Sequence, residues 1–413
     1  MTEIFDYQRL SSSLRKVDVY KTMRIVFISR KYCRGEAWCN RLLAYAKEFQ
    51  KKGVKVTLLF LAANGQSADS DEDFTGLNIR YISEFSDNDN RLVKFKIYGT
   101  AILKIQHYIN KGDILFTSDG GGLFLPFLFI HRKSNYVFSE ITEHPDIFGI
   151  GTDLRGISGC LKKSLHSLRV GFNNLLIRKL TGLFVISNGL RNYYLSHGVD
   201  HSRICKVNMF VDTNRFNIPK VQSERYIAYC GTMSISKDGV DVLINAFYRF
   251  HKTYPDYKLI LIGPYMNQKT KEVIEKLTDS PQIKDSVVLT GKVSPSQMPS
   301  LLMNASILAL SRPDNIQNRN GFPTKLGEYL ATGNPVVVTS IGEIPDYLKE
   351  GKNAYLAVPG DDISFANALL RIAKDYDAAK IVGKKGRELA LTDFSADIQT
   401  TIALNHIKKF LVE

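Results

Sequence analysis

The chain alternates between short apolar runs and helical segments along most of its length. The first example is residues 23–29 (MRIVFIS), which are followed by a loop, a helical stretch that ends at Gly53, and a second apolar run over residues 54–61. A strand, a helix and a strand in this order form a βαβ unit, whose strands lie parallel in one sheet. Further runs of strand length occupy residues 113–117, 136–140, 183–187, 226–231, 258–263, 287–291, 305–311 and 336–338. The sequence therefore predicts an α/β protein built on parallel sheets.

The length of 413 residues is sufficient for two domains of roughly 200 residues each. A hydrophobic content of 44% and a charged content of 23% are usual for a globular protein. Residues 217–225 contain Pro219 and few apolar side chains, which indicates a linker. We expect an N-terminal extension over residues 1–22, domains over residues 23–217 and 218–390, and a C-terminal helix over residues 391–413.

The most informative stretch is residues 320–340, NGFPTKLGEYLATGNPVVVTS. A Gly-Phe-Pro loop precedes Thr324, which we expect to cap a helix with one apolar face. The helix ends at a Gly-then-Pro signal, and three valines follow as a buried parallel strand. A loop that leads into a helix N-terminus presents free N–H groups and the positive end of the helix dipole. This stretch therefore predicts a diphosphate site.

Glu328 lies one turn into this helix, on the same face as Thr324, because residues four apart share a helix face. A carboxylate at this place can accept two hydrogen bonds from the hydroxyls of a ribose. The alternative is that Glu328 is a solvated helix residue and that the glycines serve only the turns.

The stretch resembles the donor-binding loop and helix of retaining GT-B glycosyltransferases of family 4 (glycosyl transferases group 1). The family pattern is a Glu, seven residues, a second Glu and a Gly-x-Pro-Val-Val run. Glu328 and residues 333–337 match the second half of this pattern. Asn320 stands where the family has its first Glu, which contacts the donor sugar. The resemblance covers nearly all of residues 23–412 and is stronger in the second domain.

This resemblance implies two Rossmann-like doubly wound domains that face each other across a cleft, with the last helix packed back toward the N-terminal domain. It also implies transfer of a sugar from a nucleotide-diphosphate donor to a glycan or lipid-linked acceptor, with retention of anomeric configuration. No cofactor and no essential metal are expected. No covalent nucleophile stands out, so the retaining step is expected to be a front-face reaction. A polyprenyl-diphosphate-linked acceptor would suit the assembly of surface polysaccharides.

The segment that opens the second domain resembles the family's Gly-Arg, short loop and Lys-Gly. Lys237 matches the lysine that neutralises the donor diphosphate, for which a point charge on a flexible stem is sufficient. Thr232 replaces the family's arginine, and Asp238 is inserted before the glycine. Arg319 or Lys325 is a candidate for the missing second cation. The alternative for Lys237 is an ordinary surface lysine.

In the first domain, His144 follows the end of a predicted strand, which is the edge at which open α/β sheets bind ligands. The resemblance places a histidine or an acidic group of this loop opposite the transferred sugar. Without the resemblance, His144 is read as a packing residue. Gly35 matches one of the glycines in the family's cleft loop.

These interpretations combine into one predicted site. The predicted catalytic residues are His144, Lys237 and Glu328. The predicted donor nucleotide and diphosphate site comprises Lys237, Lys292, Val293, Gly321, Phe322, Pro323, Thr324, Lys325, Leu326 and Glu328. Asn320 and Glu143 are predicted on the donor-sugar side, Gly35 in the cleft loop of the N-terminal domain, and a metal site is not predicted.

The net charge of +14 suits phosphate-bearing ligands, anionic lipid or nucleic acid. No helix-turn-helix, zinc-finger or RNP pattern accompanies the charge, so a nucleic-acid partner is not expected. Residues 154–180 and 91–104 alternate apolar and basic side chains, which fits either a surface helix packed on the sheet or a helix in peripheral contact with an anionic membrane.

The five cysteines form no C-x-x-C pair and indicate reduced thiols in a cytoplasmic protein. The longest apolar run, residues 123–130, is too short to cross a bilayer. We expect a cytoplasmic protein with peripheral contact at the inner face of the membrane.

Other functions stay open at this point. The loop after the first strand lacks G-x-G-x-x-G, which argues against a nicotinamide dehydrogenase. A nucleotide-sugar 2-epimerase of the same fold is one alternative. A non-catalytic nucleotide-sugar-binding protein is another, because Thr232 and Asn320 both depart from the family pattern at donor positions.

Overall fold

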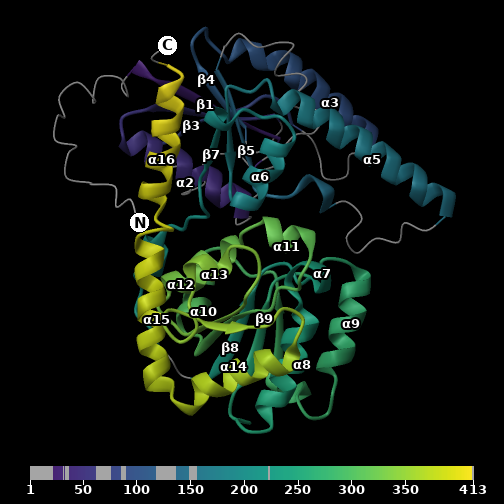
Figure 1. Cartoon of the computed structure of the whole chain (residues 1–413), viewed down its shortest axis with the longest axis vertical. Coiled ribbons are helices and arrows are strands. Elements are labelled where there is room, and N and C mark those ends of the chain that lie inside the picture. The colour runs from purple at the N-terminus through teal and green to yellow at the C-terminus, as the bar shows by residue number, and fades with distance from the viewer. Residues whose placement is uncertain are drawn as a thin grey trace.

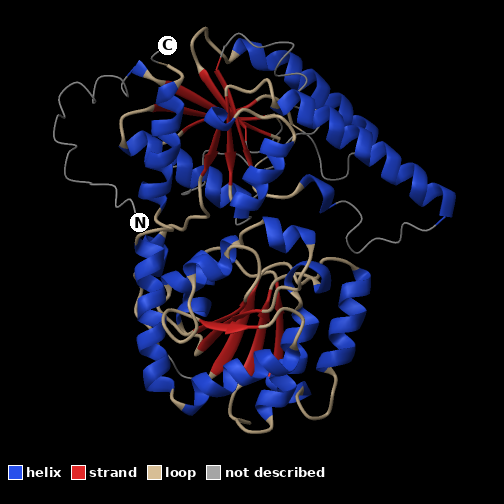
Figure 2. Ribbon diagram, in the orientation of Figure 1, coloured by secondary structure: helices blue, strands red, loops and turns tan. Residues whose placement is uncertain are grey.

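The computed structural model describes residues 22–30, 32, 37–61, 76–84, 90–117, 136–147, 156–221 and 224–411. In these residues the chain forms one parallel sheet in each half (Figures 1 and 2). The first sheet has the strand order β3-β2-β1-β4-β5-β6-β7, and the second has the order β10-β9-β8-β11-β12-β13. Gly35 and residues 1–21 lie outside the described residues.

The strands are short and their neighbours are parallel throughout. The first sheet contains β1 (Arg24–Ser29), β2 (Lys55–Phe60), β3 (Asn78–Tyr81), β4 (Ile114–Thr117), β5 (Tyr136–Ile141), β6 (Gly182–Val185) and β7 (Ile204–Lys206). The second contains β8 (Tyr226–Cys230), β9 (Lys258–Ile262), β10 (Val287–Gly291), β11 (Ile307–Leu310), β12 (Val336–Thr339) and β13 (Tyr355–Ala357).

Each sheet is doubly wound. The chain enters at a central strand, moves to one edge, and then crosses to the other side of its first strand, between β1 and β4 in one sheet and between β8 and β11 in the other. In sheets of this kind, ligands bind outside the carboxyl ends of the strands at this switch point. The predicted pair of doubly wound α/β domains is confirmed.

Helices cover both sheets (Figure 2). The first half contains α2 (Ala37–Lys51), α3 (Arg91–Lys104), η5 (Pro145–Ile147), α5 (Gly156–Ile177) and α6 (Asn188–Ser196). The connection and the second half contain η7 (Thr213–Phe216), α7 (Ile235–Asp238), α8 (Val240–His251), α9 (Gln268–Thr278), α10 (Met298–Met303), α11 (Ile316–Asn320), α12 (Thr324–Ala331), α13 (Ile344–Tyr347), α14 (Asp362–Lys374), α15 (Tyr376–Leu391) and α16 (Ala396–Lys409).

A buried polar network stabilises the first half. The Arg41 Nε and Nη2 atoms donate to the two oxygens of Glu140 at 2.8 and 2.7 Å, and the Tyr45 hydroxyl donates to the same carboxylate at 2.6 Å. Arg41 also donates to the backbone carbonyls of Val207 and Asn208. The guanidinium thus joins α2, β5 and the segment through which the chain leaves the first sheet.

The last helix returns to the first half. Ala403, Leu404 and Ile407 of α16 are buried in the hydrophobic core that contains α2 and the first sheet. The two segments that pass between the halves are bonded to each other, because the Val211 N–H donates to the Phe394 carbonyl at 3.0 Å. The domain boundaries at residues 217 and 390 stay predictions.

A close approach of two segments in the second half makes one testable prediction. A Cβ atom added at Gly383 of α15 would lie 2.5 Å from the Gly333 carbonyl oxygen. We expect Gly383→Ala to lower the free energy of unfolding by about 1–3 kcal/mol, because overpacking displaces backbone here. Urea titration measures this. A Cβ at Gly99 of α3 would meet no atom within 4 Å, so Gly99→Ala should be neutral or stabilising by up to ~1 kcal/mol.

Candidate functional site

The loops that follow the carboxyl ends of the strands in the two sheets contact each other. The loop after β5 ends at η5, and the loop after β8 contains α7. These two loops are joined by an ion pair between Lys237 Nζ and Glu143 Oε1 at 2.7 Å. The Ser187 hydroxyl after β6 donates to the Asn320 carbonyl after β11. The carboxyl ends of β5 and β6 therefore face the loops at the switch point of the second sheet.

Lys237 is positioned by a single helical turn. The Ser234 hydroxyl caps α7 by accepting from the Lys237 N–H at 3.0 Å, and Gly239 ends it with φ +61°. The side chain is about one third exposed. The predicted diphosphate lysine thus lies at the interface and pairs with Glu143, which we predicted on the donor-sugar side.

Glu143 is held by both carboxylate oxygens. Oε1 pairs with Lys237, and Oε2 accepts from the Gln317 side-chain amide at 2.8 Å. Gln317 lies in α11 and is 8% exposed. Both partners come from the second half, so Glu143 binds the first half to both α7 and α11.

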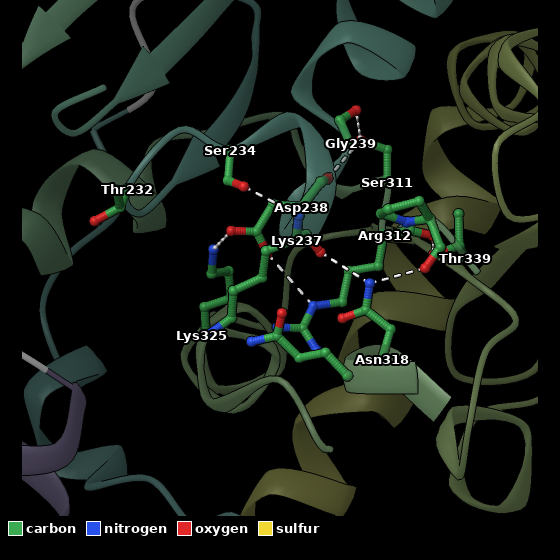
Figure 3. Close-up of polar contacts among 12 residues, drawn as sticks. Thr232, Ser234, Lys237, Asp238, Gly239, Ser311, Arg312, Asn318, Lys325 and Thr339 are labelled. Atoms are coloured by element: carbon green, nitrogen blue, oxygen red, sulfur yellow. Dashed lines mark hydrogen bonds and ion pairs between the residues drawn. The ribbon is translucent and has the colours of Figure 1, made fainter. Parts of the chain in front are cut away.

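A buried charge cluster lies directly beside Lys237 (Figure 3). The Asp238 carboxylate is 2% exposed and accepts from Lys325 Nζ at 2.8 Å, the Tyr229 hydroxyl at 2.9 Å and Arg312 Nε at 3.4 Å. Burial opposes ionisation of Asp238, but the charges of Lys325 and Arg312 outweigh it and lower the pKa to about 2. Two cations and one carboxylate leave a net positive charge at the end of β8.

Lys325 lies near Thr232, the residue that stands where the family pattern has an arginine. A Cβ at Gly231 would lie 2.5 Å from Lys325 Nζ, so the ammonium lies against the loop that carries Thr232. The Thr232 side chain points away from the cluster (Figure 3), although its backbone carbonyl lies 2.9 Å from the Tyr229 hydroxyl. Arg319, the other candidate, is exposed and pairs with Asp314 at 2.8 Å. Of the two candidates Lys325 is thus the one that lies in the charge cluster, and its role as second cation stays a prediction. Burial lowers the pKa of Lys325 while Asp238 opposes that effect.

The helix α12 begins at Thr324, so the prediction that Thr324 caps it was wrong. The cap residue is Pro323, which has an extended backbone at φ −74° and ψ 113° and makes no side-chain cap bond. Thr324 is already helical, because the proline ring fixes the turn one residue earlier. The dipole argument for the first turn is unaffected, since α12 still begins directly behind the loop.

Glu328 is half-buried and accepts from Arg215 Nη1 at 2.6 Å. Arg215 lies in η7, in the segment that connects the halves. The predicted ribose carboxylate is therefore anchored by a cation that was not identified in the sequence.

The side chains of the Gly-Phe-Pro loop divide between packing and the interface. Phe322 is buried against the rings of Tyr347 and Phe394, and Leu326 is fully buried, so both side chains belong to the core. A Cβ at Gly321 would lie 2.9 Å from the Gln317 carbonyl. Only the backbone of these residues is suited to a ligand.

His144 is buried at 5% exposure in the first half. Its Nδ1 atom accepts from the Asp146 N–H at 3.1 Å, and its ring meets Tyr193 edge-on at 4.6 Å between centroids. Burial lowers the pKa of His144, with Asp146 opposing and His197 assisting, so the imidazole is neutral at pH 7.

The other predicted residues are Asn320, Lys292 and Val293. The Asn320 side chain donates to its own helix at the Ile316 carbonyl (2.8 Å) and lies beside Gly189 of α6. Lys292 is exposed at the end of β10, and Val293 is partly buried against the core.

Sequence reasoning missed Arg312, Gln317 and Arg215. It also gave no role to Glu343, which accepts from Lys206 Nζ at 2.5 Å and from the Asn188 N–H across the interface. The position of Arg312 in the sequence could have identified it. Arg312 closely follows the apolar run of β11, and residues that follow a parallel strand lie at the edge of the sheet where ligands bind.

Comparison with known proteins agrees with this geometry. Residues 210–389 match the family model for glycosyl transferases group 1. This segment contains Lys237, Asp238, Arg312, Lys325 and Glu328.

Most of the chain superposes on solved structures at low sequence identity. Anabaena HepE in complex with UDP and glucose has a TM-score of 0.70 at 14% identity, covering 94% of this chain and 100% of that one. Sucrose-phosphate synthase from Thermosynechococcus elongatus has a TM-score of 0.71 at 14% identity, covering 95% and 100%. The chain has the GT-B fold.

Curated relatives match over a smaller part. N-acetyl-alpha-D-glucosaminyl L-malate synthase of Bacillus anthracis is 26% identical over 176 residues, which are 43% of each chain. The colanic acid biosynthesis glycosyltransferase WcaL of Salmonella typhimurium, itself described as putative, is 27% identical over 141 residues, 34% of each chain. The matches thus span less than half the length of these relatives.

Proposed function

We propose that this GT-B protein is a glycosyltransferase that moves a sugar from a nucleotide-diphosphate donor to a glycan or lipid-linked acceptor, with retention of anomeric configuration. The observation that carries the proposal is the position of two lysines, Lys237 and Lys325, at the switch-point end of the second sheet. Both lie in the segment that matches glycosyl transferases group 1. The names of the relatives, which include glycosyltransferases of glycan synthesis, support the same activity.

In this proposal the second half binds the donor. Lys237 and Lys325 place positive charge where the leaving diphosphate develops negative charge, and the first N–H groups of α12 add the helix dipole. The reaction is proposed to need no metal, since the side chains supply this charge. Asp238 fixes Lys325, and Arg215 fixes Glu328 for the ribose hydroxyls.

The first half is proposed to bind the acceptor. His144 is neutral and is fixed by the Asp146 N–H and Tyr193, so it can exchange a hydrogen bond with a sugar hydroxyl without placing a charge beside it. Glu143 holds Lys237 in the ligand-free molecule and releases it when the diphosphate arrives. A front-face reaction is proposed for retention.

The test is thermal unfolding of wild type and Glu328→Ala with UDP, GDP, ADP and CMP. A nucleotide at about one hundred times its dissociation constant should stabilise the wild type by roughly 2.7 kcal/mol. We expect one nucleotide to raise the melting midpoint of the wild type and to lose this effect in Glu328→Ala. Glu272→Ala, which changes an exposed residue of α9, is the control that should keep this effect.

No shift with any nucleotide would contradict donor binding at this site. A shift without transfer or slow hydrolysis of the matching nucleotide sugar would assign the protein to the non-catalytic binders. Release of a free epimer would assign it to the epimerases.

A further inference from the structure

Helix α5 carries a row of large apolar side chains on its solvent side. They recur at intervals of four and three residues, which places them on one face of the helix. We call this row the α5 stripe. Its members are Leu161 (61% exposed), Leu165 (59%), Leu168 (72%), Phe172 (53%) and Leu175 (54%).

The stripe is directed away from the body of the domain. Within residues 160–177, whose side chains the structure describes, the buried residues of α5 are Val170, Asn174 and Ile177, at 8%, 5% and 2% exposure. At about 100° per residue these lie on the side of the helix opposite the stripe. Figure 1 shows α5 along the outer edge of the first half, with its first turns extending past the sheet. A contiguous exposed apolar row of this kind marks an interaction surface.

The charges around the stripe have one sign. Residues 154–199 contain seven Lys and Arg and no Asp or Glu. Exposed Lys162 and Arg169 flank the stripe on one side and exposed Arg178 flanks it on the other. Apolar residues bordered by basic side chains are the pattern of helices that lie in a membrane interface and contact anionic headgroups.

Helix α3 repeats this pattern. Leu92 is 80% exposed and Leu103 is 49% exposed, while Ala101 and Ile102 of the same helix are buried. Residues 90–112 contain five Lys and Arg and no Asp or Glu. The first half therefore has two basic helices with exposed leucines.

A second copy of the chain fits the stripe less well. The four-three spacing is also that of a coiled-coil seam, in which flanking residues of opposite charge pair across the interface. Here both flanks are basic, so two copies would bring like charges together, which is unfavourable. Among the described residues no helix is long and apolar enough to cross a bilayer.

We propose that α5 binds the surface of an anionic lipid bilayer, with the stripe at the level of the acyl chains and Lys162, Arg169 and Arg178 at the headgroups. This contact does not depend on the proposed function. It is close to the predicted acceptor side, because Asn174 of α5 donates to the Tyr193 hydroxyl at 3.0 Å and Tyr193 contacts His144. Given the proposed function, a lipid-linked acceptor would meet the site from this surface.

The test is flotation of the full chain with vesicles of phosphatidylcholine alone or with one quarter phosphatidylglycerol. We expect binding to the anionic vesicles only, weakened by raising NaCl from 50 to 500 mM. The double variant L165Q/L168Q should lower the partition coefficient at least about tenfold, and K162Q/R169Q about tenfold. The control I363Q/I381Q, which changes two exposed isoleucines of the second half, should bind as wild type.

Absence of binding to anionic vesicles, or equal binding by wild type and L165Q/L168Q, would overturn the proposal. Self-association that is lost in L165Q/L168Q, measured by analytical ultracentrifugation without lipid, would assign the stripe to a second copy instead. Melting midpoints of all variants within about 2 °C of wild type, the change expected from less than 1 kcal/mol, ensure that a folded chain is compared.

Discussion

Replacing Lys237 by alanine is expected to lower kcat for sugar transfer by about 100- to 1000-fold, which is the usual cost of removing one donor to developing charge. Lys237 is partly exposed at the interface of the halves, so its removal should leave the fold intact. In the proposed reaction its ammonium stabilises the leaving diphosphate. Initial rates with saturating donor measure the effect.

Two variants sharpen this prediction. Lys271→Ala changes a partly exposed lysine of α9 and should keep wild-type kcat. Glu143→Gln removes the carboxylate that holds Lys237 at 2.7 Å. We expect several-fold tighter donor binding, because the diphosphate then no longer competes with the Glu143 carboxylate for Lys237. A Lys237→Ala enzyme with normal turnover would reduce Lys237 to an ion-pair partner of Glu143.

Replacing Asp238 by asparagine is expected to lower the free energy of unfolding by about 3–5 kcal/mol, the range for removing one partner of a buried ion pair. The substitution keeps the size of the side chain but leaves Lys325 and Arg312 without their counter-charge. Urea unfolding at pH 7 measures it. Asp256→Asn is the matched control, because Asp256 pairs with Arg225 on the surface and should contribute less than ~1 kcal/mol.

The difference in the free energy of unfolding between wild type and Asp238→Asn is expected to depend on pH. The folded pKa of Asp238 is about 2, below its unfolded value of 3.8, so ionisation stabilises the folded chain. This contribution, about 2 kcal/mol, is complete above pH 5 and is lost as the pH falls from about 4 toward 2. The stability difference between wild type and Asp238→Asn should shrink over this interval. A difference that is constant between pH 5 and pH 3 would contradict the ionised state of Asp238.

The sequence predicted the central strands because a strand buried on both faces reads as a continuous apolar run. It missed β3, β7 and β13, which have only three or four residues and lie toward the sheet edges, with residues 78–81 alternating exposed and partly buried. Such a run carries too little apolar sequence to be distinguished from a loop.

For the site, the sequence identified the residues that lie in motifs but not their partners. Lys237 and Glu143 are 94 positions apart, and Glu328 and Arg215 are 113 apart, so no local spacing relates them. The sequence also predicted α5 as an amphipathic basic helix. It could not tell which apolar face is buried, because both faces of α5 carry apolar residues.

The bond between Val211 and Phe394 joins the two connections between the halves at a single edge of the interface. Two connections joined in this way place the axis of a rotation between the halves at this edge of the interface. Figure 1 places the junction of α15 and α16 at one side of the molecule and α7 at the other. The contact between α7 and the loop that ends at η5 thus lies on the side of the interface away from this axis. A small rotation of the halves about this axis therefore produces a large change in the distance between α7 and η5. A pair of spectroscopic probes on these two elements would be well placed to follow domain motion.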